Sequence, residues 1–408
     1  MNSNNKLKIL NDPIYGFITI PNELIFDVIQ HKYFQRLRRV SQMGLTYLVY
    51  PGAHHTRFHH ALGCMHLMNS AIKVLQFKKV DISEEESTAL LLAILLHDIG
   101  HGPFSHAMEH SIVEGITHEE ISLKFMNQLN SEFDGKLSLA IEIFKGAYKR
   151  KFFNQLISSQ LDMDRADYLK RDSFYTGVAE GNINSERLIT MLNVVDNELV
   201  IEDKGIYSVE KFLLARRLMY WQVYLHKTSL VAESLLVRVL KRAKELVENG
   251  VEVEASKPFS YFLQHKINAS NFEVETLDIF AKLDDYDIVA AMKSWIDHDD
   301  VVLSNLSSMI INRNLLKVKL TKDEVSYEKF QKLQQKTKEK FGLSDHEVNY
   351  FVYKSTVSNQ AYNSSKEGIK ILSKKGKVIE ATEASDHLNL KVLSKPVKKY
   401  FVCYPKEL

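Results

Sequence analysis

The chain has 408 residues, 45% of them hydrophobic and 25% charged, and its formal net charge at pH 7 is +2. These values are typical of a globular protein, and the near-balanced charge gives no general case for binding nucleic acid or a membrane surface. The two cysteines, Cys64 and Cys403, are too few for a disulfide framework. No apolar run approaches the roughly 20 residues that span a bilayer, and the polar N-terminus is unlike a signal peptide. We therefore expect a cytoplasmic protein.

The first part of the chain predicts an extended arm followed by helices. The stretch Asn11–Ile20 has an Asn-Asp-Pro turn signal and a β-branched alternation, which indicates a short hairpin or an extended arm. From Asn22 to about Val247 the apolar spacing is mainly helical. The clearest helical stretches are 23–40, 61–74, 83–96, where Ser83 and Glu86 form a capping box, and 209–247.

Beyond Asn249 helical and strand patterns alternate. A helical pattern at 276–296 is followed by strand-like stretches at 313–320, 348–355, 368–381 and 400–405, with a turn at Lys374–Gly376. We therefore predict a mainly α protein with a helical core and a smaller C-terminal α+β lobe. The expected parts are an N-terminal arm and helix at 1–50, a catalytic core at 51–248 and the C-terminal lobe at 249–408.

The most informative stretch is HDIGHGPFSH, from His97 to His106, directly after the apolar run Ala89–Leu96. An adjacent His-Asp pair at the end of a buried helix presents two side chains that can bind a metal. Two glycines and a proline then stop the helix, so the later histidines lie on a turn that can line a cleft. Imidazole with carboxylate suits Mn, Fe, Zn or Mg better than copper or an iron–sulfur cluster.

A second pattern lies between Gln160 and Gly177. On a helix, Asp164, Tyr168 and Asp172 form one stripe of carboxylate, phenol and carboxylate, because they are four residues apart. A solvated helix face with ion pairs would have the same pattern, so the stripe alone leaves both interpretations open. The acidic cluster 297–300 could imitate a metal site, but we interpret it as a polar loop.

Histidines also gather at 51–63, in PGAHHTRFHHALG. His55 and His59 are four residues apart, and so are Thr56 and His60, so the spacing does not decide which histidine binds a metal. Further along, Thr117 has a cap-like position before His118 and Glu119.

Six stretches agree in order with one known family: NDPIYGFI, YFQRLRRVSQMG, YPGAHHTRFHHALG, LLHDIGHGPFSH, THEE and LDMDRADYLKRD. They resemble the HD-domain phosphohydrolases, and in particular the deoxynucleoside triphosphate triphosphohydrolases of the sterile-alpha-motif/HD type and their bacterial relatives, dGTPase-like enzymes. The resemblance covers residues 8–230 and includes no sterile-alpha-motif domain. It implies an HD-domain helical core.

The resemblance implies a divalent metal site with four ligands, His60, His97, Asp98 and Asp164. Arg57, beside them, matches a contact to the α-phosphate. The metal would be Mn, Mg, Fe, Zn or Ni, and the sequence does not set its identity. Such an ion neutralises phosphate charge and lowers the pKa of a bound water.

Further site residues follow from the same resemblance. His106 matches a general acid for the departing 5′-oxygen, and Glu109 matches its acidic orienting partner. His101, His118 and Glu119 match other active-site residues near the phosphate. The residues that match the substrate contacts are Arg57, Gln42, Met43, Arg165, Tyr168, Asp172, Arg216 and Tyr224. Two of them depart from the family pattern: Arg165 replaces a frequent lysine and Met43 an expected leucine.

The expected reaction is metal-dependent hydrolysis of deoxynucleoside triphosphates to a deoxynucleoside and tripolyphosphate. HD phosphohydrolases with the same ligands also cleave other nucleotides and phosphate esters, so a nucleotidase or phosphodiesterase is the alternative. A nuclease or RNA-binding role would need a basic groove, and the lysine-rich end at 374–399 is interpreted as a solvated face. We expect no membrane or nucleic-acid partner.

The family also implies a second, regulatory nucleotide site between subunits. Lys8, Ile9, Asn11, Gln35 and Arg38 match positions of that site. Gln30 replaces the aspartate that reads the guanine edge, and an amide cannot supply paired carboxylate acceptors. We therefore expect self-association to a dimer or tetramer, and an activator requirement that is not strictly guanine.

Overall fold

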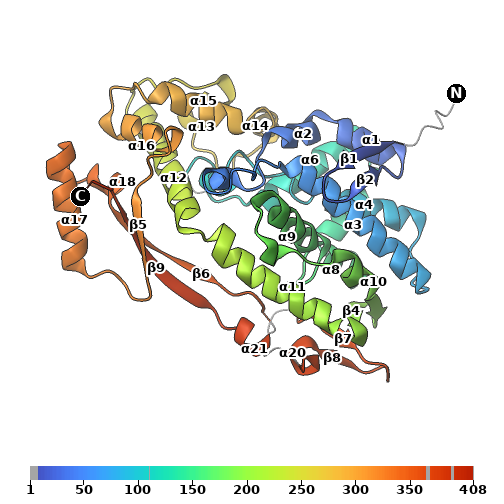
Figure 1. Ribbon diagram of the computed structural model, residues 1–408. Coiled ribbons are helices and arrows are strands. Elements are labelled where there is room, and N and C mark those ends of the chain that lie inside the picture. The colour runs from blue at the N-terminus through green and yellow to red at the C-terminus, as the bar shows by residue number, and fades with distance from the viewer. Residues whose placement is uncertain (1–7, 110, 364–367, 387–389, 408) are drawn as a thin grey trace.

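The computed structural model describes residues 8–109, 111–363, 368–386 and 390–407, without the side chains of His106, Lys391 and Val392. As predicted, the molecule is mainly helical, with small sheets at its edges (Figure 1). Among the described helices, none combines the length and the apolar character needed to cross a bilayer. Both cysteines are buried and free.

The N-terminal arm is a hairpin of β1 (Ile9–Asp12) and β2 (Gly16–Thr19), which confirms the turn signal. Asp12 Oδ1 accepts hydrogen bonds from the backbone N–H groups of residues 14 and 15, so its side chain closes the turn. The helix expected over 23–40 is instead divided at His31, whose backbone is extended and whose side chain accepts a hydrogen bond from Tyr33 N and caps the next turn. Its parts are α1 (Glu23–Gln30), α2 (Lys32–Gln35) and the 3-10 turn η1 (Arg36–Arg39), followed by η2 (Gly44–Leu48).

Three helices form the centre of the core. α3 (Arg57–Phe77) packs against both α4 (Glu84–Leu96) and α9 (Met163–Thr176). Every side chain from Ala89 to Leu96 is buried, so this part of α4 is enclosed on all sides. The predicted capping box is present at its start, where Ser83 Oγ accepts from Glu86 N at 3.1 Å. Around these helices lie α5 (Ser105–Glu109), α6 (His118–Glu132), α7 (Ser138–Phe144), α8 (Lys151–Ile157), η3 (Ala179–Gly181) and α10 (Ser185–Thr190).

A hairpin interrupts the part of the chain that the sequence indicated as mainly helical. It pairs β3 (Leu192–Val195) with β4 (Glu198–Glu202), and the 3-10 turn η4 (Asp203–Gly205) follows. Asp196 and Asn197 form the turn with φ angles of 50° and 63°. Aspartate and asparagine tolerate this left-handed conformation, and β-branched residues occur on both sides of them. The hairpin signal was therefore present in the sequence, but the surrounding helical periodicity obscured it.

The long helix expected over 209–247 is also divided. α11 (Ile206–Met219) continues into a π-helix, η5 (Tyr220–Tyr224), and α12 (Lys227–Glu248) begins after a break at His226. The sequence contains neither glycine nor proline there, so it has no local breaker signal. The His226 side chain accepts a hydrogen bond from Thr228 N and caps the second helix.

The C-terminal third alternates helices and strands as predicted. Its elements are α13 (Lys257–Gln264), α14 (Val274–Phe280), α15 (Asp285–Trp295), α16 (Val301–Ile311), β5 (Lys317–Thr321), α17 (Tyr327–Phe341), α18 (Val348–Phe351), β6 (Tyr353–Asn359), β7 (Lys370–Leu372), β8 (Val378–Glu380), α20 (Ala381–Ala384), α21 (Leu390–Leu393) and β9 (Val397–Tyr404). The strand expected at 348–355 is wrong in its first half, which is helical. The turn at Lys374–Gly376 joins β7 to β8 as expected.

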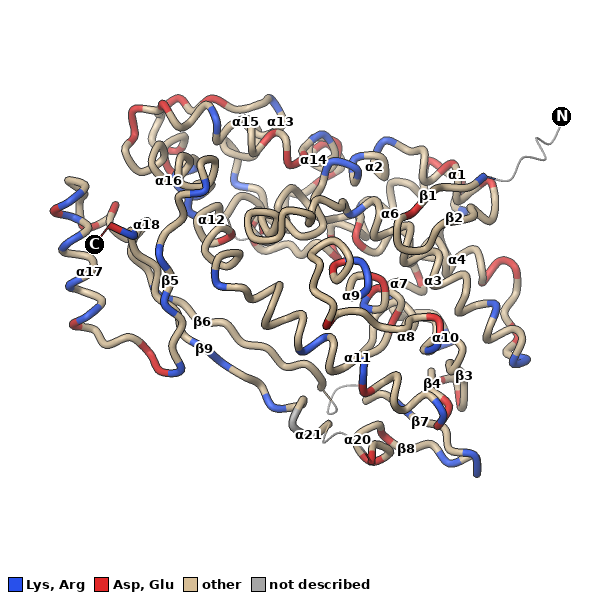
Figure 2. Tube along the Cα trace, in the orientation of Figure 1, with Lys and Arg blue, Asp and Glu red and all other residues tan. Residues whose placement is uncertain are grey.

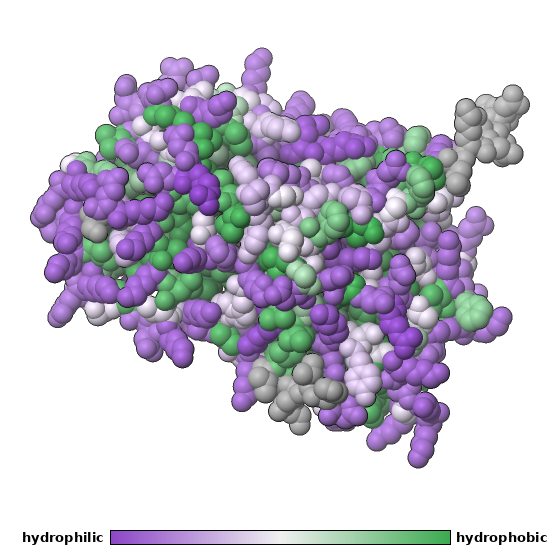
Figure 3. Space-filling view, in the orientation of Figure 1, coloured by the Kyte–Doolittle hydropathy of each residue, from purple (hydrophilic) through white to green (hydrophobic). Residues whose placement is uncertain are grey.

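The strands of the C-terminal third form two different sheets. β9 pairs antiparallel with β5 on one side and with β6 on the other, and lysines recur along β5 and β9 (Figure 2). Apolar side chains show on this face over the same sheet, beside α12 (Figure 3). β7, in contrast, pairs in parallel with β4 of the helical core. The proposed division at residue 248 stays a prediction, and one sheet crosses it.

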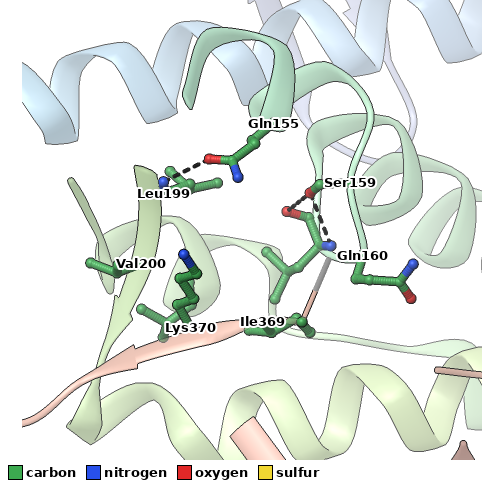
Figure 4. A pocket seen from close by; sticks show the side chains of 10 residues that line it. Gln155, Ser159, Gln160, Leu199, Val200, Ile369 and Lys370 are labelled. Carbon is green, nitrogen blue, oxygen red and sulfur yellow. Dashed lines mark hydrogen bonds between the residues drawn. The ribbon is translucent and has the colours of Figure 1, made fainter. Parts of the chain in front are cut away.

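A small cavity of about 30 Å³ lies where β7 meets the core (Figure 4). Gln155 from α8 accepts a hydrogen bond there from the backbone N–H of Leu199 at 2.8 Å. The volume can hold water but not a nucleotide. A site for a ligand of that size must therefore lie elsewhere, and the predicted metal ligands place it at the ends of α4 and α9.

Candidate active site

The four side chains predicted to bind a metal converge at the centre of the core. His60 comes from α3, His97 and Asp98 from the end of α4, and Asp164 from α9. His60 Nε2 and His97 Nε2 lie 3.1 Å and 3.5 Å from Asp164 Oδ1. His97 Nε2 also lies 3.5 Å from Asp98 Oδ1. Two imidazole nitrogens and two carboxylates therefore face one another.

The hydrogen bonds of the two histidines leave their Nε2 lone pairs free for a cation. His97 Nδ1 must donate to the carbonyl oxygen of Ile94, 2.6 Å away, because that oxygen can only accept. His97 Nε2 is buried and has no hydrogen-bond partner among the described residues. His60 Nδ1 likewise donates to Asp167 Oδ2 at 2.7 Å. Metal-binding histidines commonly donate their second N–H in this way, so the residues fit a divalent metal ion.

The two carboxylates are ionised at neutral pH. Burial opposes the charge on Asp164, but its close contacts with His60 and His97 hold its pKa well below the usual range. Burial also opposes the charge on Asp98, and the nearby His97, His101 and Arg57 lower its pKa. Ionised carboxylates are the form that binds a metal.

Cys64 lies beside this group, with Sγ 3.5 Å from His60 Nδ1. Burial raises the pKa of the thiol, so it stays protonated at neutral pH. A neutral thiol is a poor metal ligand. Its position is consistent with packing rather than with a fifth ligand.

Asp167 is a supporting residue that the sequence analysis missed. Arg171 holds it with two parallel hydrogen bonds of 2.9 Å and 3.0 Å, and Arg171 also donates to Asp12 in the N-terminal hairpin at 2.8 Å. All three side chains are buried. Gly63 permits this packing, since a Cβ there would lie 2.0 Å from Asp167 Oδ1. The sequence signal for Asp167 was the group of three aspartates within LDMDRAD, but the sequence alone did not decide which of these carboxylates point into the core.

A second group of titratable side chains adjoins Asp98. His101 Nε2 lies 3.3 Å from Asp98 Oδ1, and the His101 ring stacks on His118 at 3.9 Å. His118 Nδ1 lies 3.1 Å from Glu109 Oε1, which also accepts from Ser105 Oγ at 3.0 Å. His118 Nε2 lies 3.3 Å from Glu119 Oε1. Thr117 caps α6 as predicted, which places His118 at its first position.

The surroundings of this second group determine which of its side chains are charged and which are neutral. Burial, followed by the positive charge of Arg57, lowers the pKa of His101 to about 3, so it is neutral. Burial opposes protonation of His118, but the hydrogen bond with Glu109 raises its pKa. Burial opposes the charge on Glu109, and its contacts with His118 lower its pKa to about 2. His106 lies on α5 between these residues, but its side chain is outside the described part of the structure.

A cavity of about 660 Å³ opens over both groups, which is within the usual range for ligand sites. The predicted residues that line it are Gln42, Met43, Arg57, Asp98, His101, His118, Asp164, Arg165, Tyr168, Asp172 and Tyr224. The stripe on α9 therefore faces a cavity and not solvent. Arg216 does not line it, but donates to Gln160 Oε1 at 3.4 Å with its guanidinium 5.9 Å from the Tyr220 ring.

The far end of the cavity is aromatic. The rings of Tyr168 and Tyr224 meet edge to face at 6.0 Å. Tyr224 Oη donates to Asp172 Oδ2 at 2.7 Å, and His55 Nε2 lies 2.6 Å from Asp172 Oδ1. His55 is buried and stacks on Tyr175 at 4.3 Å. Among the histidines that spacing left undecided, His55 therefore contacts Asp172.

Two arginines place positive charge in the cavity. Arg57 Nη1 lies 2.5 Å from Asp98 Oδ2, next to the metal ligands. Arg165 donates from Nε to the backbone oxygen of Ser159 at 2.7 Å and to Asp162 Oδ2 at 3.2 Å. Both contacts use Nε, so they fix the direction of the planar guanidinium, a shape that a lysine ammonium does not have.

The residues matched to a regulatory site lie outside this cavity. Lys8 Nζ lies 3.6 Å from the centre of the Phe26 ring and pairs with Glu23, while Ile9 and Asn11 lie on β1. Arg38 donates to Gln35 Oε1 at 2.9 Å, and its guanidinium covers the Phe58 ring at 3.6 Å. Their role in binding a nucleotide stays a prediction.

The acidic cluster near His298 has structural contacts instead of a shared centre. Asp300 caps α16 and pairs with Arg242 at 2.6 Å. His298 Nε2 donates to the backbone oxygen of Glu252 at 3.2 Å. These contacts agree with the interpretation of a polar loop.

Comparisons with known proteins agree with this geometry. Residues 57–172 match the HD domain family and residues 183–257 match the HD associated region. A crystal structure of a phosphohydrolase from Bacteroides thetaiotaomicron has a TM-score of 0.95 and 51% identity, covering 98% of this chain and 100% of that one. The uncharacterized protein YwfO of Bacillus subtilis is 36% identical over 316 residues, which is 76% of this chain and 71% of that protein. The deoxynucleoside triphosphate triphosphohydrolase SAMHD1 homolog of Dictyostelium discoideum is 31% identical over 272 residues, which is 62% of this chain and 52% of that protein.

Proposed function

Because this chain belongs to the HD-domain phosphohydrolases, which are metal-dependent enzymes, we propose that it hydrolyses deoxynucleoside triphosphates to a deoxynucleoside and tripolyphosphate. One observation carries the proposal. A single cavity joins the His/Asp ligand group to Arg57, Arg165 and an aromatic end at Tyr168 and Tyr224. The name of the Dictyostelium relative supports the same substrate class.

The metal held by His60, His97, Asp98 and Asp164 would neutralise phosphate charge and activate water for attack at the α-phosphorus. Arg57, beside these ligands, would hold the same phosphate through charge-assisted hydrogen bonds.

Arg165, which lines the cavity, would bind the rest of the triphosphate. Gln42 and Met43 also line the cavity and would contact the sugar and base.

The aromatic end supports a preference for deoxyribose. Asp172 would accept the 3′-hydroxyl hydrogen bond, since the carboxylate is held by Tyr224 and His55. Tyr168 and Tyr224 would occupy the space that a 2′-hydroxyl needs. A 2′-hydroxyl in contact with these rings would lose its hydrogen bonds to water without gaining a new hydrogen-bond partner.

The histidine group would handle the leaving group. We assign His106 as the general acid for the 5′-oxygen, with Glu109 as its orienting partner and His101, His118 and Glu119 beside the phosphate. Glu109 lies on α5, as does His106, and its contacts with His118 and Ser105 hold its negative charge in this helix. A positioned acid of this kind typically contributes a rate factor of roughly 10²–10⁴.

A product assay tests the reaction. Purified protein is incubated separately with each dNTP, the matching NTPs and dNMPs, with Mn²⁺ or Mg²⁺, and the products are separated by chromatography. We expect tripolyphosphate and deoxynucleoside from dNTPs only. Orthophosphate as the first product from every nucleotide would favour the nucleotidase or phosphodiesterase alternative, and equal turnover of ATP and dATP would contradict the deoxyribose preference.

A double substitution tests the metal assignment. His97→Ala with Asp98→Ala should remove both the bound metal and hydrolysis from a folded protein. The matched control is His298→Ala with Asp299→Ala, a second adjacent His-Asp pair that lies on the polar loop. Retained activity in the first variant would contradict the ligand set.

We also propose that the chain self-associates and that Lys8, Ile9, Asn11, Gln35 and Arg38 contribute to a regulatory nucleotide site between copies. Because Gln30 lacks a carboxylate, activation should not require guanine strictly. Light scattering with and without each NTP, alongside dNTP hydrolysis rates, tests both points. A strictly monomeric active enzyme contradicts the first, and activation by GTP alone contradicts the second.

A further inference from the structure

Asp285, in the C-terminal third, bridges two walls of the active-site cavity. Its Oδ2 accepts from the backbone N–H of Ser41 at 2.8 Å and its Oδ1 accepts from the backbone N–H of Phe104 at 3.2 Å. Ser41 and Phe104 both line the cavity. The two donors are separated by 63 positions in the chain, and Asp285 lies on a third segment, outside residues 57–172 that match the HD domain.

The Phe104 turn needs a partner. Its φ angle is 45°, in the left-handed region that a bulky side chain seldom adopts. Such a residue costs roughly 1–3 kcal/mol and persists only where its surroundings hold it. Phe104 is buried, so its N–H would also lose a hydrogen bond without Asp285. The Phe104 carbonyl accepts from Ala107 N at 2.8 Å and so begins α5, which carries His106 and Glu109.

The Ser41 contact holds a second segment of the cavity lining. Ser41 pairs with Thr56, and the neighbouring Val40 carbonyl accepts from Arg57 N at 2.9 Å. The segment that Asp285 binds is therefore followed in the chain by Gln42. The same segment is hydrogen-bonded to the start of α3. A shift of Ser41 would move both the nucleoside wall and the arginine beside the metal ligands.

Asp285 is not needed to cap its own helix. Asp284 supplies that cap, accepting from Tyr286 N at 3.0 Å, while Asp287 accepts from Asp284 N at 2.8 Å. Asp284 also pairs with Arg39. Both oxygens of Asp285 are therefore available for the two cavity walls, and its side chain is 7% exposed.

We propose that Asp285 is a positioning residue of the active site, whose carboxylate sets the spacing between the Ser41–Gln42 wall and helix α5. The C-terminal third is then part of the catalytic machinery, although it contributes none of the expected metal ligands. The consequence for rate rests on the proposed phosphohydrolase reaction, but the link between the walls does not.

The test compares Asp285→Asn with Asp287→Asn. Both variants lose one carboxylate from the first turn of α15, but only the first leaves the N–H of Ser41 or Phe104 facing an amide NH₂. Hydrogen exchange by mass spectrometry should show at least tenfold faster exchange of the 40–44 and 104–109 amides in Asp285→Asn and no change there in Asp287→Asn. Equal exchange in the two variants would overturn the proposal, and this arm requires no substrate.

Kinetics then test the positioning role. With dNTP as substrate, Asp285→Asn should lower kcat at least tenfold while bound Mn²⁺ matches Asp287→Asn, because a displacement of about 1 Å costs up to 10²-fold. If kcat and KM equal those of the control, the positioning role is wrong. If wild type cleaves no dNTP but the exchange result holds, the substrate proposal fails and the bridge stands.

A double-mutant cycle covers poor folding of the first variant. Glycine adopts a positive φ without strain, so Phe104→Gly should reduce the effect of Asp285→Asn on exchange of the 104–109 amides. Asp285→Glu keeps the charge but displaces it by one methylene, and should fold while losing kcat. Additive effects in the cycle together with full activity of Asp285→Glu would contradict the proposal.

Discussion

The Nδ1 nitrogen of His60 lies 2.7 Å from the Oδ2 oxygen of Asp167, and both side chains are shielded from solvent. The carboxylate fixes the imidazole so that Nε2 faces Asp164, 3.1 Å away. Arg171 balances the charge of Asp167 and is itself anchored to Asp12. The N-terminal hairpin therefore supports the orientation of an expected metal ligand.

Removal of this carboxylate should weaken metal binding. In Asp167→Asn the amide accepts less strongly from His60 Nδ1–H, and supporting partners of this kind typically contribute about 10–100-fold to affinity. We expect the Kd for Mn²⁺, measured by calorimetry, to rise by that factor. Asp134→Asn, on an exposed turn, is the control. Unchanged affinity in a folded Asp167→Asn protein would show that His60 does not need this partner.

At Gly63, packing and helix propensity predict opposite effects of an alanine substitution on the free energy of unfolding. Glycine to alanine inside a helix normally stabilises by roughly 1 kcal/mol. At Gly63 the new Cβ would lie 2.0 Å from Asp167 Oδ1, so we expect Gly63→Ala to lower the free energy of unfolding by about 1–3 kcal/mol. Urea denaturation measures it, with Ser70→Ala on α3 as the control. A stabilised Gly63→Ala protein would mean that Asp167 and Arg171 can move away freely.

The parts of the site that were predictable from sequence share a local signal. The His97-Asp98 pair follows an apolar run, and Ser83 and Glu86 have the spacing of a capping box, so one stretch of sequence is enough for each. The resemblance then selected His60 among neighbouring histidines, which spacing could not do. Physical interpretation alone left the α9 stripe undecided between a solvated face and a functional site.

The parts that were missed depend on contacts between distant segments. Asp285 meets Ser41 across 244 positions, and Arg171 meets Asp12 across 159. Neither contact has a sequence period or a turn signal. The break at His226 is similar, since the chain there has no helix breaker. In contrast, the β3–β4 turn had a local signal that helical periodicity outweighed.

The pair of Glu109 and His118 predicts a pH dependence of stability. The contacts with His118 lower the pKa of Glu109 from 4.5 to about 2 against the effect of burial. A depressed carboxyl pKa stabilises the folded state above the unfolded value, and this contribution is lost as pH falls from 4.5 toward 2. The difference in urea midpoint between wild type and Glu109→Gln should therefore shrink from pH 6 to pH 3.5. Glu142→Gln, at an exposed site on α7, is the control, and its difference in urea midpoint from wild type should stay constant over this pH range. A constant difference for Glu109→Gln would contradict the lowered pKa of Glu109.

The contact between His55 and Asp172 predicts an effect on sugar recognition. His55 Nδ1 has no partner among the described residues, so the proton sits on Nε2 and points at Asp172 Oδ1. His55→Gln removes both this hydrogen bond and the stack on Tyr175, which frees the carboxylate to turn away from a 3′-hydroxyl. Hydrogen bonds to charged groups contribute about 1.5–3 kcal/mol, so the preference for dNTP over the 2′,3′-dideoxy analogue should fall by about tenfold or more.

The measurement is the ratio of kcat/KM for the two nucleotides, because a general loss of activity cancels in the ratio. His59→Gln is the matched control, since His59 belongs to the same motif and bonds Thr56 at the start of α3 instead of Asp172. We expect the His59 variant to keep the wild-type ratio. If both variants keep it, Asp172 recognises the sugar without help from His55, or the 3′-hydroxyl binds elsewhere in the cavity.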